Sequence, residues 1–282
     1  MELEWHIRSV ARSLDVLRAV NGAGSLSMMQ IARRCAIPYP TARRIVHTLQ
    51  QEGMLEREPS RKHYRPTALV QALSHGYQDH SGIVEISRPH LEALTRKHCW
   101  PVSLVTRVGQ TMVVRDCTHA MSPMALNNYQ AGATFPLLEC ASGHVMLAYA
   151  TPEQRALMLR GATESGTPLG PSTRELFEDI SWSETIRAAG IATRSNNRFT
   201  NTPGRTSSIA VPIFHNGEVC AALTLVYFSV SMRPEVALDR YANDLKKAAD
   251  AVTLRLTEHD TGRIESTATL KRDVQGAKLG VA

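Results

Sequence analysis

The 282-residue sequence lacks the usual marks of a secreted or membrane-spanning protein. Its five cysteines are scattered and odd in number, unlike a disulfide framework, so we expect reduced thiols in a cytoplasmic protein. No apolar run approaches the roughly 20 residues that a membrane-spanning helix needs. The first residues, Met1-Glu2-Leu3-Glu4, are acidic and do not resemble a secretory signal. We therefore expect no membrane partner.

Motifs of common enzymes are also missing. The sequence has no serine nucleophile elbow, phosphate-binding loop or zinc-helix motif. The runs Cys117-Thr118-His119 and Cys140-Ala141-Ser142-Gly143-His144 bring possible metal ligands close together. Neither run supplies the paired clusters of a tetrahedral zinc site. We predict no catalytic residue, no metal and no cofactor, although an enzyme fused to another module stays an alternative.

Positive charge, by contrast, is present and concentrated in one stretch. The net charge is +6 at pH 7, and residues 28–65 hold eight Arg or Lys against three Glu. A local basic field attracts phosphates and speeds encounter with DNA. This distribution favours nucleic acid as a partner.

Three short helices are predicted before residue 53. Ile7, Val10, Ala11, Leu14 and Leu17 recur at helical spacing, and Asn21-Gly22 is a helix stop. Ser27 to Gln30 forms a capping box for a second helix over 28–35. Pro40 suits the first turn of a third helix, in which Ala42, Ile45, Val46 and Leu49 share one face. Two short helices joined by a tight turn form the geometry that docks in a major groove.

A β-hairpin follows the third helix and resembles a wing. Residues 54–57 and 61–65 read as strands around the turn residues Glu58-Pro59-Ser60, and the tip is basic. The residues predicted to contact double-stranded DNA are Thr41, Arg43, Arg44, His47, Arg61 and Lys62. A protein-binding module with solvated arginines is the alternative interpretation.

The rest of the chain predicts a linker and a mixed domain. Residues 67–78 show helical spacing of apolar residues, which need a partner from this chain or a second subunit. Hairpins are predicted at Gly109-Gln110 and Asn216-Gly217, and helices at 89–97, 143–149, from 151, from 172 and at 234–256. Strand hairpins with helices between them favour an α+β domain with an antiparallel sheet.

These residues together resemble the IclR family of transcription regulators. The resemblance is carried by runs in both halves of the chain: Ser9-Val10-Ala11-Arg12-Ser13-Leu14, Thr41-Ala42-Arg43-Arg44, Phe135-Pro136-Leu137-Leu138, Ala141-Ser142-Gly143 and Ile209-Ala210-Val211-Pro212-Ile213. Within the family the chain is most similar to regulators of aromatic-acid (hydroxyphenylpropionate) catabolism, through Cys99-Trp100-Pro101, Thr118-His119 and Leu225-Val226-Tyr227. The resemblance implies a multidomain protein: a winged helix-turn-helix domain (1–66), a linker helix (67–80) and a GAF-like effector-binding domain (81–256). We expect a disordered tail over 257–282.

The resemblance also implies a function and a ligand site. It implies a regulator of a catabolic operon that forms a homodimer or homotetramer and responds to a small, aromatic carboxylate effector. The narrower resemblance favours an activator, for which RNA polymerase would be a partner. A second unit that only oligomerises is the alternative. Carried over from the family, the effector-binding candidates are Ser142, Gly143, Arg194, Ser208 and Thr224.

Two further candidates come from side-chain chemistry. The indole of Trp100 can stack on an aromatic ring, although a core aromatic is the alternative. Arg115, at the end of a strand, and Arg194 are possible carboxylate partners, and a solvated loop arginine is the alternative for Arg194.

Overall fold

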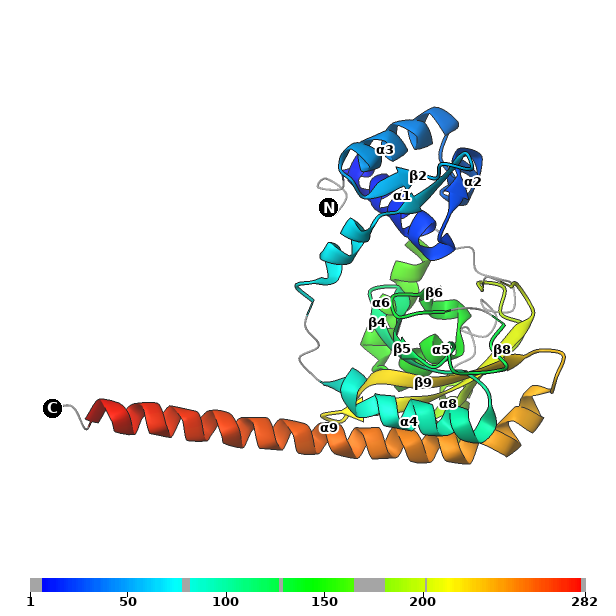
Figure 1. Ribbon diagram of the computed structural model, residues 1–282. Helices are drawn as coiled ribbons and strands as arrows, with labels where there is room; N and C mark the ends of the chain where they lie inside the picture. The colour runs from blue at the N-terminus through cyan, green and yellow to red at the C-terminus, as the bar shows by residue number, and fades with distance from the viewer. Residues whose placement is uncertain (1–6, 78–81, 127–128, 165–180, 201, 280–282) are drawn as a thin grey trace. The chain divides into compact units, whose positions relative to one another are not determined.

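The computed structural model describes residues 7–77, 82–126, 129–164, 181–200 and 202–279, and only the backbone over 163–164 and 260–279. The chain divides into two compact units, Met1–Gln78 and Asp79–Ala282, and each is described by itself (Figure 1).

The first unit is a winged helix-turn-helix. Its elements are α1 (Arg8–Ala23), β1 (Leu26–Ser27), α2 (Met28–Arg34), α3 (Tyr39–Gln51), β2 (Leu55–Arg57), β3 (His63–Pro66) and the 3-10 helix η1 (Ala68–Ser74). The capping box forms, because Gln30 Oε1 accepts from Ser27 N at 2.8 Å and Ser27 Oγ accepts from Gln30 N. The three strands form one sheet in the order β1-β3-β2. β1 was not expected, since two residues are too few for a sequence pattern.

The apolar face of α1 differs from the prediction. Val16, Leu17 and Val20 pack into the core of the unit, whereas Ile7, Val10 and Leu14 are exposed. Leu17 belongs to both apolar stripes, the N-terminal one with Ile7, Val10 and Leu14 and the C-terminal one with Val16 and Val20. Packing against α3 buries the C-terminal stripe. The other stripe stays uncovered in the single chain.

The linker segment is also different from the prediction. Residues 68–74 form a 3-10 helix rather than an α-helix, after Thr67 caps it by accepting from Leu69 N. Val70 packs on the core of the first unit, while Leu69, Leu73 and Tyr77 are exposed. A single unit therefore covers only part of the apolar stripe.

The second unit is built on a six-stranded antiparallel sheet in the order β6-β5-β4-β9-β8-β7. The strands are β4 (Val102–Val108), β5 (Thr111–Cys117), β6 (Thr134–Pro136), β7 (Ala192–Arg194), β8 (Thr206–His215) and β9 (Glu218–Phe228). The β8–β9 turn is the predicted one: Asn216 and Gly217 have φ of 52° and 79°, as a type I′ hairpin requires. β6 and β7 are short edge strands that the sequence pattern did not predict.

Helices cover both faces of this sheet. The helices are α4 (Ile83–His98), α5 (Ala141–Tyr149), α6 (Pro152–Glu164), α8 (Ser181–Ala189) and α9 (Pro234–Leu279), with the 3-10 helix η2 at Leu137–Glu139. α4 and α9 lie side by side on one face (Figure 1), where Leu223 and Leu225 of β9 are buried. α5 packs on the opposite face, against Ala210 and Ala222. The alternation along β8 and β9 thus divides the core into two layers.

Two helix boundaries correct the sequence-based expectation. α4 begins at Ile83, so Pro89 lies inside the helix and not at its start. The α9 backbone stays helical to Leu279, where a disordered tail was expected from residue 257. Residues 257–279 contain no proline, the residue that most strongly interrupts a helix. The predicted helix start at 172–175 lies outside the described residues, as do residues 280–282.

Among the residues described, no helix is both long and apolar enough to span a membrane.

Candidate DNA interface and effector cavity

The turn between α2 and α3 fixes how α3 is presented. Ile37 N donates to Ala32 O at 3.0 Å, and Ala36 adopts a φ of 51°, so the chain reverses within four residues. The buried Ala42 and Val46 then hold one side of α3 against the unit. The opposite side of α3 is left to solvent.

That solvent side carries the predicted DNA-contacting side chains. Arg43, Arg44 and His47 are exposed, and Thr41 is half-buried at the start of the helix. Neither arginine forms an ion pair with any residue that the structure describes, so both guanidinium groups are available to an anionic partner. Tyr39, at the start of α3, is also exposed (46%).

The wing is the β2–β3 hairpin, and Arg61 and Lys62 are exposed at its tip. Glu58 ties its base to the segment before α2, because Ser25 Oγ donates to the Glu58 carboxylate at 2.5 Å. Arg61 Nε also lies 4.0 Å from Glu58. The hairpin therefore exposes the positive charges of Arg61 and Lys62, and the nearby Glu58 carboxylate partly neutralises that of Arg61. Contact of these residues with DNA stays a prediction.

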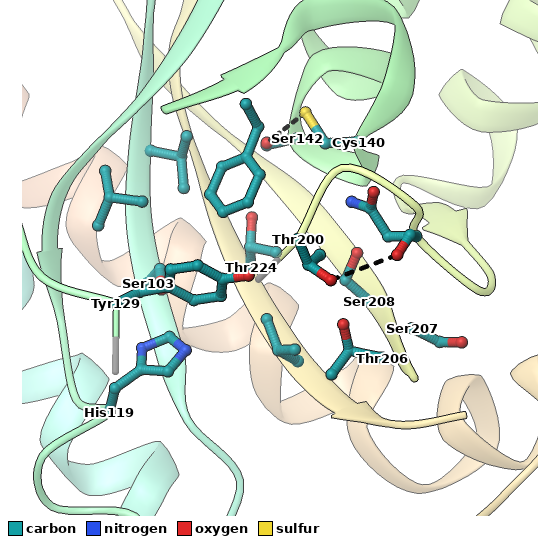
Figure 2. Close-up of a pocket in the computed structure, with 15 residues that line it drawn as sticks. Ser103, His119, Tyr129, Cys140, Ser142, Thr200, Thr206, Ser207, Ser208 and Thr224 are labelled. Carbon is teal, nitrogen blue, oxygen red and sulfur yellow. Dashed lines mark hydrogen bonds between the residues drawn. The ribbon is translucent and has the colours of Figure 1, made fainter. Parts of the chain in front are cut away.

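A cavity lies in the second unit, on the face of the sheet that α5 covers. It holds about 490 Å³ of space free of atoms, part of it open to solvent. Figure 2 shows hydroxyl, amide and aromatic side chains converging on it. We call this the effector cavity, and its lining residues are Ser103, Val105, Val114, His119, Tyr129, Phe135, Cys140, Ser142, Asn197, Thr200, Thr206, Ser207, Ser208, Thr224 and Val226.

Three of the predicted effector-binding residues line this cavity, namely Ser142, Ser208 and Thr224. Gly143 does not, and its role is steric. A Cβ on Gly143 would lie 1.7 Å from Leu137 O, so only glycine allows the first turn of α5 to approach η2 this closely. Gly143 therefore places Ser142 at the cavity wall without touching the cavity itself.

Trp100 is a core residue rather than a ligand contact. Its indole N–H donates to Tyr241 Oη at 3.0 Å, and its ring packs edge-on against Phe228, with ring centroids 5.2 Å apart. It is buried on the α4–α9 side of the sheet, away from the effector cavity. The indole proton is satisfied inside the core, as a buried tryptophan usually requires.

Neither predicted arginine reaches the effector cavity. Arg115 lies in β5 at the β-bulge, where the register shifts between Leu104 and Val105 of β4, and it does not line the cavity. Arg194, in β7, donates from Nη2 to the carboxylate of the buried Glu139. Among the described residues that line the cavity, none is lysine or arginine.

Two buried polar atoms at the cavity wall have no hydrogen-bond partner among the residues described. They are Thr224 Oγ1 and His119 Nδ1. Burial lowers the pKa of His119 to about 4, so its imidazole is neutral near pH 7. Unpaired buried polar atoms cost free energy, and a bound ligand can satisfy them.

Sequence reasoning missed most of this wall. His119 was considered as a possible metal ligand and as part of the family resemblance, but not as an effector contact. No group of three metal-ligating side chains occurs in the described part of the chain. Asn197, Thr206 and Ser103 carried no sequence signal, because single polar residues in strands and loops are common.

The first unit is a winged helix-turn-helix, and the second is an α+β unit with a cavity. This combination defines a class of protein, the transcription regulators with one unit for DNA and one for a small molecule. Comparison with known families agrees. Residues 9–59 match the IclR helix-turn-helix domain, and residues 75–254 match the bacterial transcriptional regulator IclR C-terminal domain. The chain belongs to the IclR family.

Curated relatives are named as transcription regulators too. The regulator TsaQ1/TsaQ2 of Comamonas testosteroni is 26% identical over 156 residues, covering 55% of this chain and 56% of that protein. BhcR of Paracoccus denitrificans is 29% identical over 226 residues, covering 78% of this chain and 77% of its own. The chain thus matches little more than half the length of the first relative.

Solved structures share the fold. An IclR-family regulator from Brucella abortus is 22% identical, with a TM-score of 0.64, 90% of this chain covered and 94% of its own. An IclR homologue from Microbacterium hydrocarbonoxydans, complexed with 4-hydroxybenzoate, is 23% identical, with a TM-score of 0.57, 89% of this chain covered and 99% of its own. At these identities the likeness concerns the fold alone.

Proposed function

We propose that this regulator controls a catabolic operon, as an activator, in response to a small aromatic carboxylate held in the effector cavity. The observation that carries the proposal is the pair of unpartnered buried atoms, Thr224 Oγ1 and His119 Nδ1, beside an apolar wall. Val105, Val114 and Phe135 belong to that wall. A concave apolar site with a few converging polar groups is typical of small-molecule binding.

The carboxylate would lie at the α5 end of the effector cavity. Ser142 stands there in the first turn of α5, where backbone N–H groups have no partner within the helix and favour an anion. This arrangement replaces the arginine that the sequence suggested. The 4-hydroxybenzoate bound to the Microbacterium homologue has the same ligand chemistry, which supports the choice of aromatic acids as probes.

The operator would be contacted by Thr41, Arg43, Arg44 and His47 of α3, with Arg61 and Lys62 of the wing. The exposed apolar stripe on α1 (Ile7, Val10, Leu14) supports a second copy as a partner, since an uncovered stripe of this kind favours association. Homodimers or homotetramers would then bind a roughly palindromic operator. Effector binding would shift the population of operator-competent arrangements, and RNA polymerase would be the partner of the active form.

Calorimetric titration of the full chain tests the ligand site. We expect saturable binding of 4-hydroxybenzoate, benzoate or 3-(4-hydroxyphenyl)propionate, with about one ligand per chain. Thr224→Val should weaken binding by about fivefold or more, because it removes a hydroxyl that only a ligand can pair. The fold should tolerate this change, since Oγ1 has no partner among the described residues.

Thr106→Val is the matched control. Thr106 lies in β4, as Thr224 lies in β9, but it does not line the cavity. Its replacement should leave the affinity unchanged. Absence of binding across the whole panel would favour the alternative, a second unit that only oligomerises.

A further inference from the structure

His119 is held in place by a buried hydroxyl network. The preceding residue, Thr118, is fully buried; its N donates to Val102 O at 3.0 Å, and its Oγ1 accepts from Val102 N at 2.9 Å. The same hydroxyl lies 2.6 Å from Thr95 Oγ1 of α4. The backbone at residue 118 is thus tied to both β4 and α4. The backbone that carries His119 is therefore held rigidly, and the position of the imidazole ring does not depend on a bound ligand.

The imidazole of His119 faces the effector cavity with an unused nitrogen. The side chain is 3% exposed, and its ring packs edge-on against Tyr129, with centroids 5.1 Å apart. Nδ1 has no hydrogen-bond partner among the residues described. Burial keeps the ring neutral by lowering its pKa to about 4. A neutral imidazole can donate or accept one hydrogen bond at this atom, and it offers no charge to a carboxylate.

The polar group that suits His119 is therefore an uncharged one. In Figure 2, His119 and Ser142 lie at opposite ends of the residues drawn, with Tyr129 and Thr224 between them. A ligand whose carboxylate lies at Ser142 would direct its far end towards His119. A phenolic hydroxyl at that far end matches Nδ1 in charge and in hydrogen-bonding capacity.

A second, smaller cavity lies on the other side of His119. It holds about 190 Å³ of space free of atoms, part of it open to solvent, and His119, Thr206 and Val226 line both cavities. The remaining walls are nearly all apolar and include Met124 and Leu126. Of the three shared residues, His119 has the largest side chain, so a smaller residue at this position would widen the connection between the two cavities.

We propose that His119 determines which aromatic acid this regulator accepts, by pairing with a neutral hydroxyl opposite the carboxylate and by closing the effector cavity against the smaller one. The inference rests on the proposed function of the cavity. It names the effector class more narrowly, as a hydroxylated aromatic acid of one ring.

The first test is the affinity ratio between 4-hydroxybenzoate and benzoate, measured by calorimetry on the full chain. The wild type should bind the hydroxylated acid about tenfold more tightly, because benzoate leaves Nδ1 unpaired. His119→Leu should bring the ratio close to one. His119→Asn keeps a polar group near the position of Nδ1 and should retain most of the preference, and Thr106→Val should retain all of it.

The second test is a gain of binding. His119→Ala should open the wall between the two cavities. The variant should therefore bind biphenyl-4-carboxylate, a longer acid, with a Kd at least tenfold lower than that of the wild type. A variant that merely unfolded could not produce this gain.

The outcomes separate the two levels of the proposal. If the wild type binds both benzoates and His119→Leu leaves their ratio unchanged, or if His119→Ala gains nothing with the longer acid, the role of His119 is overturned and the effector cavity stands. If the wild type binds no acid at all, the proposed function fails, and the role of His119 fails with it.

Discussion

Arg194 of β7 donates from Nη2 to the carboxylate of Glu139 in η2, and this carboxylate side chain is only 1% exposed. The ion pair joins the edge strand of the sheet to the segment that leads into α5. It therefore stabilises the segment that precedes Ser142 of the effector cavity. Because Arg194 already pairs with Glu139, it does not reach the ligand site for which the family resemblance made it a candidate.

Replacement of Glu139 tests this structural role. Glu139→Ala should lower the free energy of unfolding by about 2–4 kcal/mol, because it leaves Arg194, with its side chain 21% exposed, without its counterion. Urea denaturation measures the change. In a double-mutant cycle, Glu139→Ala combined with Arg194→Met should cost clearly less than the sum of the two single changes. Additive costs would show that the pair contributes nothing as a pair.

Substitutions on α3 test the DNA interface. Arg43→Ala with Arg44→Ala should weaken binding to an operator selected from a random DNA library. If both guanidinium groups contact phosphates, the slope of log affinity against log salt should fall by about 2. Arg240→Ala, an exposed arginine on α9, is the control and should change neither quantity. An unchanged salt slope in the double variant would contradict docking through this face of α3.

Gly143→Ala tests the close approach of α5 and η2. Its Cβ would meet Leu137 O at 1.7 Å, so the backbone must shift. We expect a loss of about 2 kcal/mol or more in unfolding free energy, measured by urea denaturation, because overpacking against backbone is not relieved by a rotamer change. Gly22→Ala is the matched control: it lies in α1 with nothing within 4 Å of the added carbon, and it should be neutral or stabilising. Equal effects at both glycines would refute the steric assignment.

Two buried histidines predict how stability depends on pH. Burial lowers the pKa of His119 to about 4. Burial also lowers the pKa of His144 to about 4; the positive charge of Arg194 adds to this effect, and the hydrogen bond to the Leu138 carbonyl opposes it. The unfolded chain takes up these protons near pH 6.5 and the folded chain only near pH 4, so stability falls as the pH drops through this window. Between pH 7 and pH 5 each histidine should account for about 2 kcal/mol of the loss.

Denaturation at the two pH values measures this dependence. His144→Gln and His119→Leu should each reduce the difference between pH 7 and pH 5, whereas His47→Gln, on the exposed face of α3, should not. A pH difference that is the same in both buried-site variants as in the wild type would show that other groups control it.

Sequence patterns were sufficient wherever one element satisfies its own constraints. Ser27 and Gln30 cap α2 because the two side chains and the two backbone donors lie within four residues. Asn216-Gly217 directs a hairpin because both residues tolerate positive φ. Ala42, Ile45 and Val46 identify the inner face of α3, and the exposed position of Arg43 and Arg44 follows from them.

Only the tertiary structure decided the roles of residues that meet across the fold. Trp100 hydrogen-bonds to Tyr241, 141 residues away, and Arg194 pairs with Glu139, 55 residues away. These partners hold both side chains outside the effector cavity. His119 and Thr224 come from strands and turns far apart in the sequence, and their unpaired atoms exist only because burial removed water from them. Local periodicity determines helices, turns and faces, since it reports neighbours within one turn or one strand. A binding site depends on which side chains remain unsatisfied after packing, and no local pattern carries that information.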